Sequence, residues 1–97
     1  MERFSFDRII RTSYSEVYYI YEDNSHIGEL HIHVLKNSPS HFTLILDTDV
    51  KDDAENSILE QIDLGIANDF DVPYHGYYIR VFRGTLEDDY EIINENI

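Results

Sequence analysis

The residues with the plainest capacity for chemistry are Glu29, His31 and His33, which alternate along one short segment. In a strand, alternate side chains share a face about 6.5 to 7 Å apart, so two imidazoles and a carboxylate would lie on one surface. Such groups are ligands for zinc and other divalent ions, and an open coordination position would make the site catalytic. His26 and His41 lie near the ends of the same predicted hairpin and would enlarge this cluster if the strand register brings them together.

A polar, solvent-facing strand explains the same three residues more simply, because this pattern of two histidines is short and no distant third histidine is forced onto its face. We therefore keep a metal-binding enzyme or sensor using Glu29, His31 and His33 as an alternative hypothesis. The main expectation is that the protein holds no metal and no other cofactor.

Other catalytic patterns have little support in this sequence. The chain has no cysteine, and it contains no GxSxG elbow, P-loop or GxGxxG motif. Carboxylates are plentiful, but acid–base catalysis by a carboxylate pair needs a cleft that perturbs one pKa, and a chain of 97 residues has little room for one. We expect no catalytic residues and no enzymatic activity.

Five runs of alternating or continuous apolar residues predict five strands, because side chains alternate between the two faces of a strand. They cover residues 3–10, 16–22, 26–35, 41–47 and 77–83. A turn at residues 37–40, which contains Pro39, joins the third run to the fourth, so these two predict an antiparallel hairpin.

Between the fourth and fifth runs the apolar period changes to four. This spacing predicts a helix from Asp53 to Phe70, since residues four apart share one helical face. Asp52 and Glu55 have the spacing of a capping box at its start, and Pro73 is expected to end it.

After Gly84, the spacing of Leu86, Tyr90, Ile93 and Ile97 predicts a short C-terminal helix. The expected fold is therefore a single α+β domain over residues 1–97, with element order ββββαβ and a final helix. A mainly antiparallel sheet of about five strands would be covered by one central helix and the short C-terminal helix.

The acidic residues are concentrated in two segments. The chain has 20 Asp and Glu against 7 Lys and Arg, a formal net charge of −13. Residues 47–71 account for −8 and residues 84–97 for −5, so the remainder is neutral. This charge opposes direct binding to nucleic acid or to an anionic membrane, and no run approaches the roughly eighteen apolar residues of a membrane span. The sequence also lacks the apolar run of a secretory signal, so we expect a cytoplasmic protein.

Carboxylates three or four residues apart on a helix form a row of negative charge similar to a phosphate backbone. Solvation of ordinary helix faces is the simpler explanation, but like charges at this spacing destabilise a helix, which suggests a use. We therefore expect a small, acidic, non-enzymatic protein-binding module that covers the basic surface of a nuclease or nucleic-acid-binding effector. In composition and size alone it is similar to small antitoxins, immunity proteins and anti-CRISPR inhibitors. The expected partner-binding residues are Glu55, Glu60, Asp63, Glu87, Asp88, Glu91, Tyr77 and Tyr78.

Tyrosine is the second unusual feature, with eight residues in the chain. Adjacent Tyr77 and Tyr78 must point to opposite faces of their strand, so only one of them can enter a given core. Tyrosine is enriched at binding hot spots, and a tyrosine-bearing sheet would also suit a homodimer. A structural homodimer subunit is therefore the third hypothesis.

Overall fold

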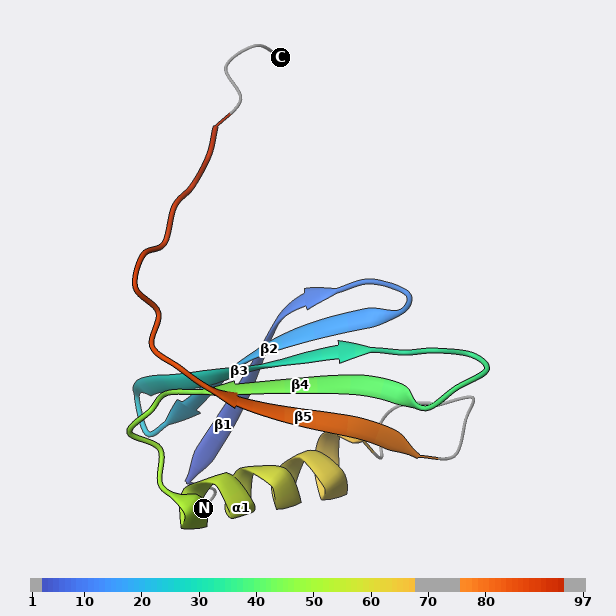
Figure 1. The fold of residues 1–97 in the computed structure, drawn as a ribbon, viewed down its shortest axis with the longest axis horizontal. Helices are drawn as coiled ribbons and strands as arrows, with labels where there is room; N and C mark the ends of the chain where they lie inside the picture. Colours follow the sequence, from blue (N-terminus) through green and yellow to red (C-terminus); the bar gives the residue numbers. More distant parts are fainter. Residues whose placement is uncertain (1–2, 68–75, 94–97) are drawn as a thin grey trace.

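The predicted strands and the central helix are present in the computed structural model, which describes residues 3–67 and 76–93 (Figure 1). The strands are β1 (Phe4–Arg11), β2 (Ser15–Glu22), β3 (Ser25–His33), β4 (Ser40–Leu46) and β5 (Tyr77–Arg83). The helix α1 (Asp52–Gln61) continues into a wider π-helical turn, η1 (Ile62–Ile66). The α+β class is thereby confirmed.

The five strands form one sheet in the order β1-β2-β3-β4-β5. The first four are antiparallel neighbours, which confirms the hairpin formed by β3 and β4, but β5 runs parallel to β4. The expectation of a mainly antiparallel sheet was wrong, and the sheet is mixed. The reason is the connection: the chain leaves β4, passes through α1 on one side of the sheet and returns in the same direction as β4.

The hydrophobic core lies between α1 and one face of the sheet. From the helix, Ala54, Ile58 and Ile62 are buried at spacings of four residues. They share this core with alternate side chains of β1 to β4. These are Phe4, Ile20, Leu30, Ile32, Phe42, Leu44 and Leu46.

The opposite face of the sheet, which we call the open face, has no described helix packed on it (Figure 1). Strand register and side-chain alternation place on it Val17, Tyr19, Tyr21, Glu29, His31, His33, His41, Thr43, Ile45, Tyr78, Arg80 and Phe82. Tyr78 and Phe82 are 59% and 53% exposed. One face of the sheet is therefore a core wall, and the other presents aromatic and histidine side chains to solvent.

The predicted capping box at the start of α1 was wrong. Lys51 is the N-cap residue and makes no side-chain capping hydrogen bond, so Asp52 is already the first helical residue. The carboxylate of Glu55 faces Arg83 instead of turning back to the helix start. Asp52, Asp53 and Glu55 still lie in the first turn, where negative charge favours the helix dipole. The predicted end at Phe70 and Pro73 lies outside the described residues, and no helix in the described part is long and apolar enough to cross a membrane.

The predicted C-terminal helix was also wrong over the residues that can be compared. Residues 84–93 form neither helix nor strand, and they run away from the sheet beyond the end of β5 (Figure 1). Leu86, Tyr90, Ile92 and Ile93 are 72%, 76%, 87% and 72% exposed, so these side chains have few packing contacts. A short helix depends on such contacts, and here it would also bring like charges together. The remaining residues of the predicted helix, 94–97, lie outside the described part.

Because α1 is packed on the sheet and residues 85–93 are exposed, an alanine substitution in the core of α1 should lower the free energy of unfolding far more than one in residues 85–93. Ile58 is fully buried, so Ile58→Ala should leave a cavity and lower the free energy of unfolding by about 2 to 4 kcal/mol. Leu86→Ala, in the exposed segment, should change it by less than about 0.5 kcal/mol. Urea denaturation of both variants measures these values, and a comparable loss for Leu86→Ala would show that residues 84–93 pack against the domain.

Candidate functional site

The three helix acids predicted to bind a partner differ in what they contact. Glu60 is exposed. Glu55 is half-buried and accepts a hydrogen bond from Arg83, with Nη2 and Oε1 2.8 Å apart. Asp63 is exposed but accepts a hydrogen bond of 2.7 Å from the Tyr77 hydroxyl. Glu55 therefore stabilises the fold, while Glu60 and part of Asp63 remain available to a partner.

Arg83, at the end of β5, ties that strand to the start of α1. Besides Glu55, its guanidinium donates to the backbone carbonyl of Val50 and lies 3.4 Å from the Asp52 carboxylate. These contacts join the helix to the strand that follows it in the chain. Part of the acidic charge predicted to face a partner is therefore already compensated within the protein.

The acids after β5 are placed differently. Gly84 is hydrogen-bonded to the sheet: its backbone N–H donates to the carbonyl oxygen of Leu46 at a distance of 3.0 Å. Beyond it, Glu87, Asp88 and Glu91 are exposed, and none of them forms an ion pair with any residue that the structure describes. This segment therefore offers uncompensated charge beside exposed apolar side chains.

The predicted partner-binding acids thus form two groups rather than one row. In Figure 1, α1 lies below the sheet and residues 84–93 run upward, away from the helix. Sequence reasoning placed both groups on helices covering one sheet, because it assigned the second group to a helix. The two groups lie in separate parts of the protein, and we call residues 84–93 the acidic segment.

Tyr77 and Tyr78 occupy opposite faces of β5. Tyr77 faces the core side, where its ring stacks on Phe42 with centroids 4.4 Å apart. Burial raises the pKa of Tyr77 to about 12, and the hydrogen bond to Asp63 and its negative charge add to this rise. Tyr78 lies on the open face, 5.6 Å from the His41 ring. Tyr78 is thus the one of the two that a partner can reach.

The alternative metal site was predicted at Glu29, His31 and His33. The three residues follow one another along the open face, but the closest ion-pair approach is 4.0 Å, between His31 Nε2 and Glu29 Oε1. Within residues 3–67 and 76–93, no group of three or more His, Cys, Asp or Glu side chains is placed to hold a metal ion. The described side chains therefore do not assemble this site.

The remaining strand histidines are far from each other. His41 pairs in register with His33, at one end of the hairpin. His26 lies at the other end, with its ring 4.6 Å from that of Tyr19 and 5.3 Å from that of Tyr21. The suggested approach of His26 to His41 does not occur, because antiparallel pairing places the start of β3 opposite the end of β4.

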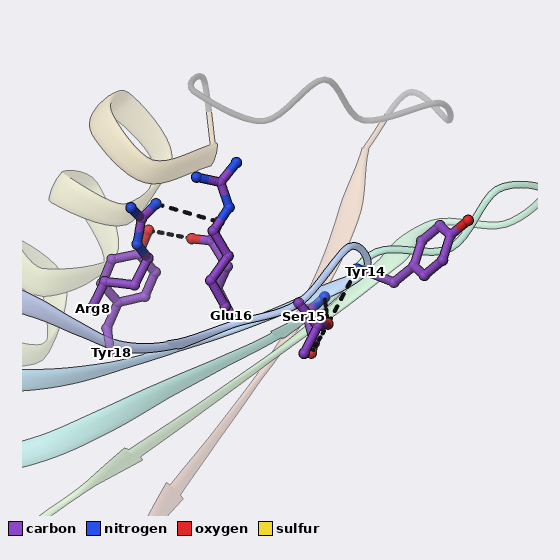
Figure 2. A network of polar contacts seen from close by, with 7 residues as sticks. Arg8, Tyr14, Ser15, Glu16 and Tyr18 are labelled. Carbon is purple, nitrogen blue, oxygen red and sulfur yellow. Dashed lines mark hydrogen bonds and ion pairs between the residues drawn. The ribbon is translucent and has the colours of Figure 1, made fainter.

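A polar cluster around Glu16 was not foreseen. Glu16 is only 6% exposed, and it accepts a hydrogen bond of 2.5 Å from the Tyr18 hydroxyl (Figure 2). Arg8 and Arg11 lie 3.6 and 3.5 Å from its other oxygen. Burial raises the pKa of Tyr18 to about 12, and the hydrogen bond to Glu16 adds to the rise.

The backbone explains why this cluster was missed. Simple alternation along β1 would put Arg8 and Arg11, three residues apart, on opposite faces. A shift in register between Arg8 and Ile10 pairs Arg8 with Tyr18 and Arg11 with Glu16, so both arginines reach the same carboxylate. No feature of the sequence alone marks this bulge. The cluster compensates a buried charge, which identifies it as a structural element.

Comparison with known proteins gives no match, since neither a protein-family model nor a curated protein matches this sequence. The function is therefore inferred from the geometry. Glu16, Glu55 and Tyr77 serve the fold. The acidic segment and the open face remain as surfaces with no structural role among the described residues.

The raised pKa of Tyr77 predicts a particular loss of stability at high pH. An unfolded tyrosine loses its proton near pH 10.0, but folded Tyr77 holds it until about pH 12. The folded state therefore binds more protons in this range, and the free energy of unfolding falls as pH rises from about 10 to about 12. Phenylalanine has no proton to lose, so Tyr77→Phe should show a shallower fall.

Denaturant midpoints measured at several pH values between these limits test this prediction. Tyr18→Phe should reduce the slope in the same direction, because the pKa of Tyr18 is also raised to about 12. Equal slopes for the wild type and Tyr77→Phe would contradict the role assigned to the contact between Tyr77 and Asp63.

Proposed function

We propose that this protein is a non-enzymatic binding module that captures a basic protein surface, such as the nucleic-acid-binding groove of a nuclease or another effector. The observation that supports this most is the acidic segment. Within ten residues it holds four carboxylates and four large apolar side chains, all exposed. These are Glu87, Asp88, Asp89 and Glu91, with Leu86, Tyr90, Ile92 and Ile93.

The composition of this segment suits a partner with a basic, partly apolar groove. Exposed apolar side chains grouped on one short segment are typical of interaction sites, because burying them on a partner is favourable. The carboxylates would steer the segment toward positive charge and speed association at low salt. Ordering the segment on binding has an entropic cost, so we expect moderate affinity and rapid exchange.

The exposed acids of α1 would support this contact from the body of the protein. Glu60 is exposed and Asp63 retains an exposed carboxylate, whereas Glu55 is held by Arg83. We therefore assign Glu55 to the fold and no longer to the partner surface. With a net charge of −13, direct binding to nucleic acid is disfavoured, so inhibition would act through the effector protein in the cytoplasm.

Reversal of two charges in the acidic segment tests this proposal. Glu87→Lys with Glu91→Lys should lower affinity for the basic partner by at least about tenfold, because it replaces attraction with repulsion at the contact. The partner is identified by affinity purification at low salt, and binding of the purified partner is then measured by titration calorimetry.

Asp7→Lys with Asp49→Lys makes the same change in net charge at two exposed positions that are not among the proposed partner-binding acids. This matched control should bind within about twofold of the wild type if the segment itself makes the contact. Equal losses for the two double variants would mean that only overall charge matters, and unchanged binding by the segment variant would overturn the proposal.

A further inference from the structure

The open face has the properties of a surface that is covered in solution. It carries Tyr78 and Phe82, both more than half exposed, beside the partly buried Tyr19 and Ile45. Exposed aromatic residues grouped on one sheet face are typical of interaction surfaces, because each aromatic ring buries a large apolar area when a partner covers it. Arg80 lies among them and makes no hydrogen bond or ion pair with another described residue.

The acidic segment has a complementary pattern when it is laid down as an extended chain. Alternate side chains then point to opposite sides, which places Leu86, Tyr90 and Ile92 together. Glu87 and Glu91 point the other way. Asp88 lies on the apolar side and Ile93 on the acidic side, but three of the four large apolar side chains share one side and three of the four carboxylates share the other, which approximates the pattern of a strand with one buried side.

The segment begins on the open face. Leu86 lines a shallow hollow together with His26, Glu29 and Ile45, which lie at the end of the sheet where β5 stops. Beyond Leu86 the chain runs away from its own sheet (Figure 1). The apolar side chains further along the segment therefore do not cover the open face of the same copy. At about 3.3 Å per residue, nine extended residues reach about 30 Å. The distance across a sheet of five neighbouring strands is about 19 Å, so the segment is long enough to cross the whole face of a second copy.

We propose that the open face of each copy receives the acidic segment of a second copy, giving a two-fold symmetric dimer with exchanged C-terminal segments. The apolar side of the segment, with Tyr90 and Ile92, packs on Tyr78 and Phe82 of the other copy. Asp88 lies on the same side of the extended segment, so it brings a carboxylate to Arg80, which makes no ion pair with any residue that the structure describes. Both contacts form twice, because a two-fold axis makes the exchange reciprocal.

The area involved is sufficient for a stable dimer. A large apolar or aromatic side chain buries about 150 Å² or more, and each segment brings several of them together with the face that receives them. With Tyr90 and Ile92 on Tyr78 and Phe82, two reciprocal contacts bury about 1,200 Å², which lies at the lower end of the roughly 1,200 to 2,000 Å² that specific, stable interfaces bury. Exchange of a terminal segment also requires no refolding of the domain, since the segment is already extended.

In this dimer the other copy covers the apolar side of the segment, so the basic partner of the proposed function contacts the segment through its carboxylates rather than through Tyr90 and Ile92. With the apolar side on the sheet, Glu87 and Glu91 point outward and remain available to a basic partner. The two proposals also fail separately. A monomer that captures a basic partner contradicts the exchange alone, and a dimer that captures none contradicts the proposed function alone.

The test is the mass of the full chain in solution, measured by light scattering over about a hundredfold range of protein concentration. We expect twice the chain mass of 11.5 kDa. Tyr90→Ser with Ile92→Ser in the segment, and Tyr78→Ser with Phe82→Ser on the face, should each weaken the dimer by at least about tenfold. All four side chains are exposed in a single copy, so both variants should remain folded, which circular dichroism and thermal melting verify.

The matched control is Glu87→Gln with Glu91→Gln, which alters the outward side of the same segment and should leave the dimer intact. A wild-type chain that is monomeric at every concentration would overturn the inference, including the case in which the segment folds back on its own sheet. A dimer that persists with Tyr90→Ser and Ile92→Ser would also overturn it, because another surface must then hold the copies together.

Discussion

The packing of Ile58 and Ile62 of α1 onto one face of the sheet is the constraint from which the other features follow. One helix of this length covers one face of five strands, so the apolar residues that alternate onto the other face stay exposed. The same helix forms the connection that makes β5 parallel to β4 and leaves the chain at one end of the sheet. The open face and the free acidic segment are thus two consequences of a single one-sided core.

The distribution of charge follows the same architecture. Four arginines are used within the domain, since Arg3 pairs with Glu22, Arg8 and Arg11 lie beside Glu16, and Arg83 holds Glu55. These contacts compensate the buried Glu16 and part of the acidic charge at the start of α1. Among the described residues, acids that form no ion pair include Glu60 and Asp63 of the helix and the four carboxylates of the acidic segment.

The sequence was informative wherever one periodicity dominated. Alternating or continuous apolar runs located the strands, and apolar residues every four positions located α1. The C-terminal prediction failed because Leu86, Tyr90 and Ile93 fit a helix while Leu86, Tyr90 and Ile92 fit an extended chain. Local sequence cannot decide between these periods when no tertiary surface selects one of them.

Features that depend on the pairing of distant residues were beyond sequence analysis. The parallel placement of β5 results from the path of the connection. The buried Glu16 depends on a bulge in β1, and the separation of His26 from His41 depends on strand register. Among the proposed partner residues, the exposure of Glu60, Glu87 and Tyr78 agrees with a surface role, whereas Glu55 and Tyr77 were assigned to a partner because their internal contacts could not be read from spacing.

The most direct test of charge-driven capture is the salt dependence of the dissociation constant for the purified basic partner. If the acidic segment makes the contact, affinity should fall steeply as salt concentration rises, and Glu87→Gln with Glu91→Gln should reduce that slope, since fewer charges are then involved. An affinity that does not change with salt, or a slope that is the same in both proteins, would contradict capture through this segment.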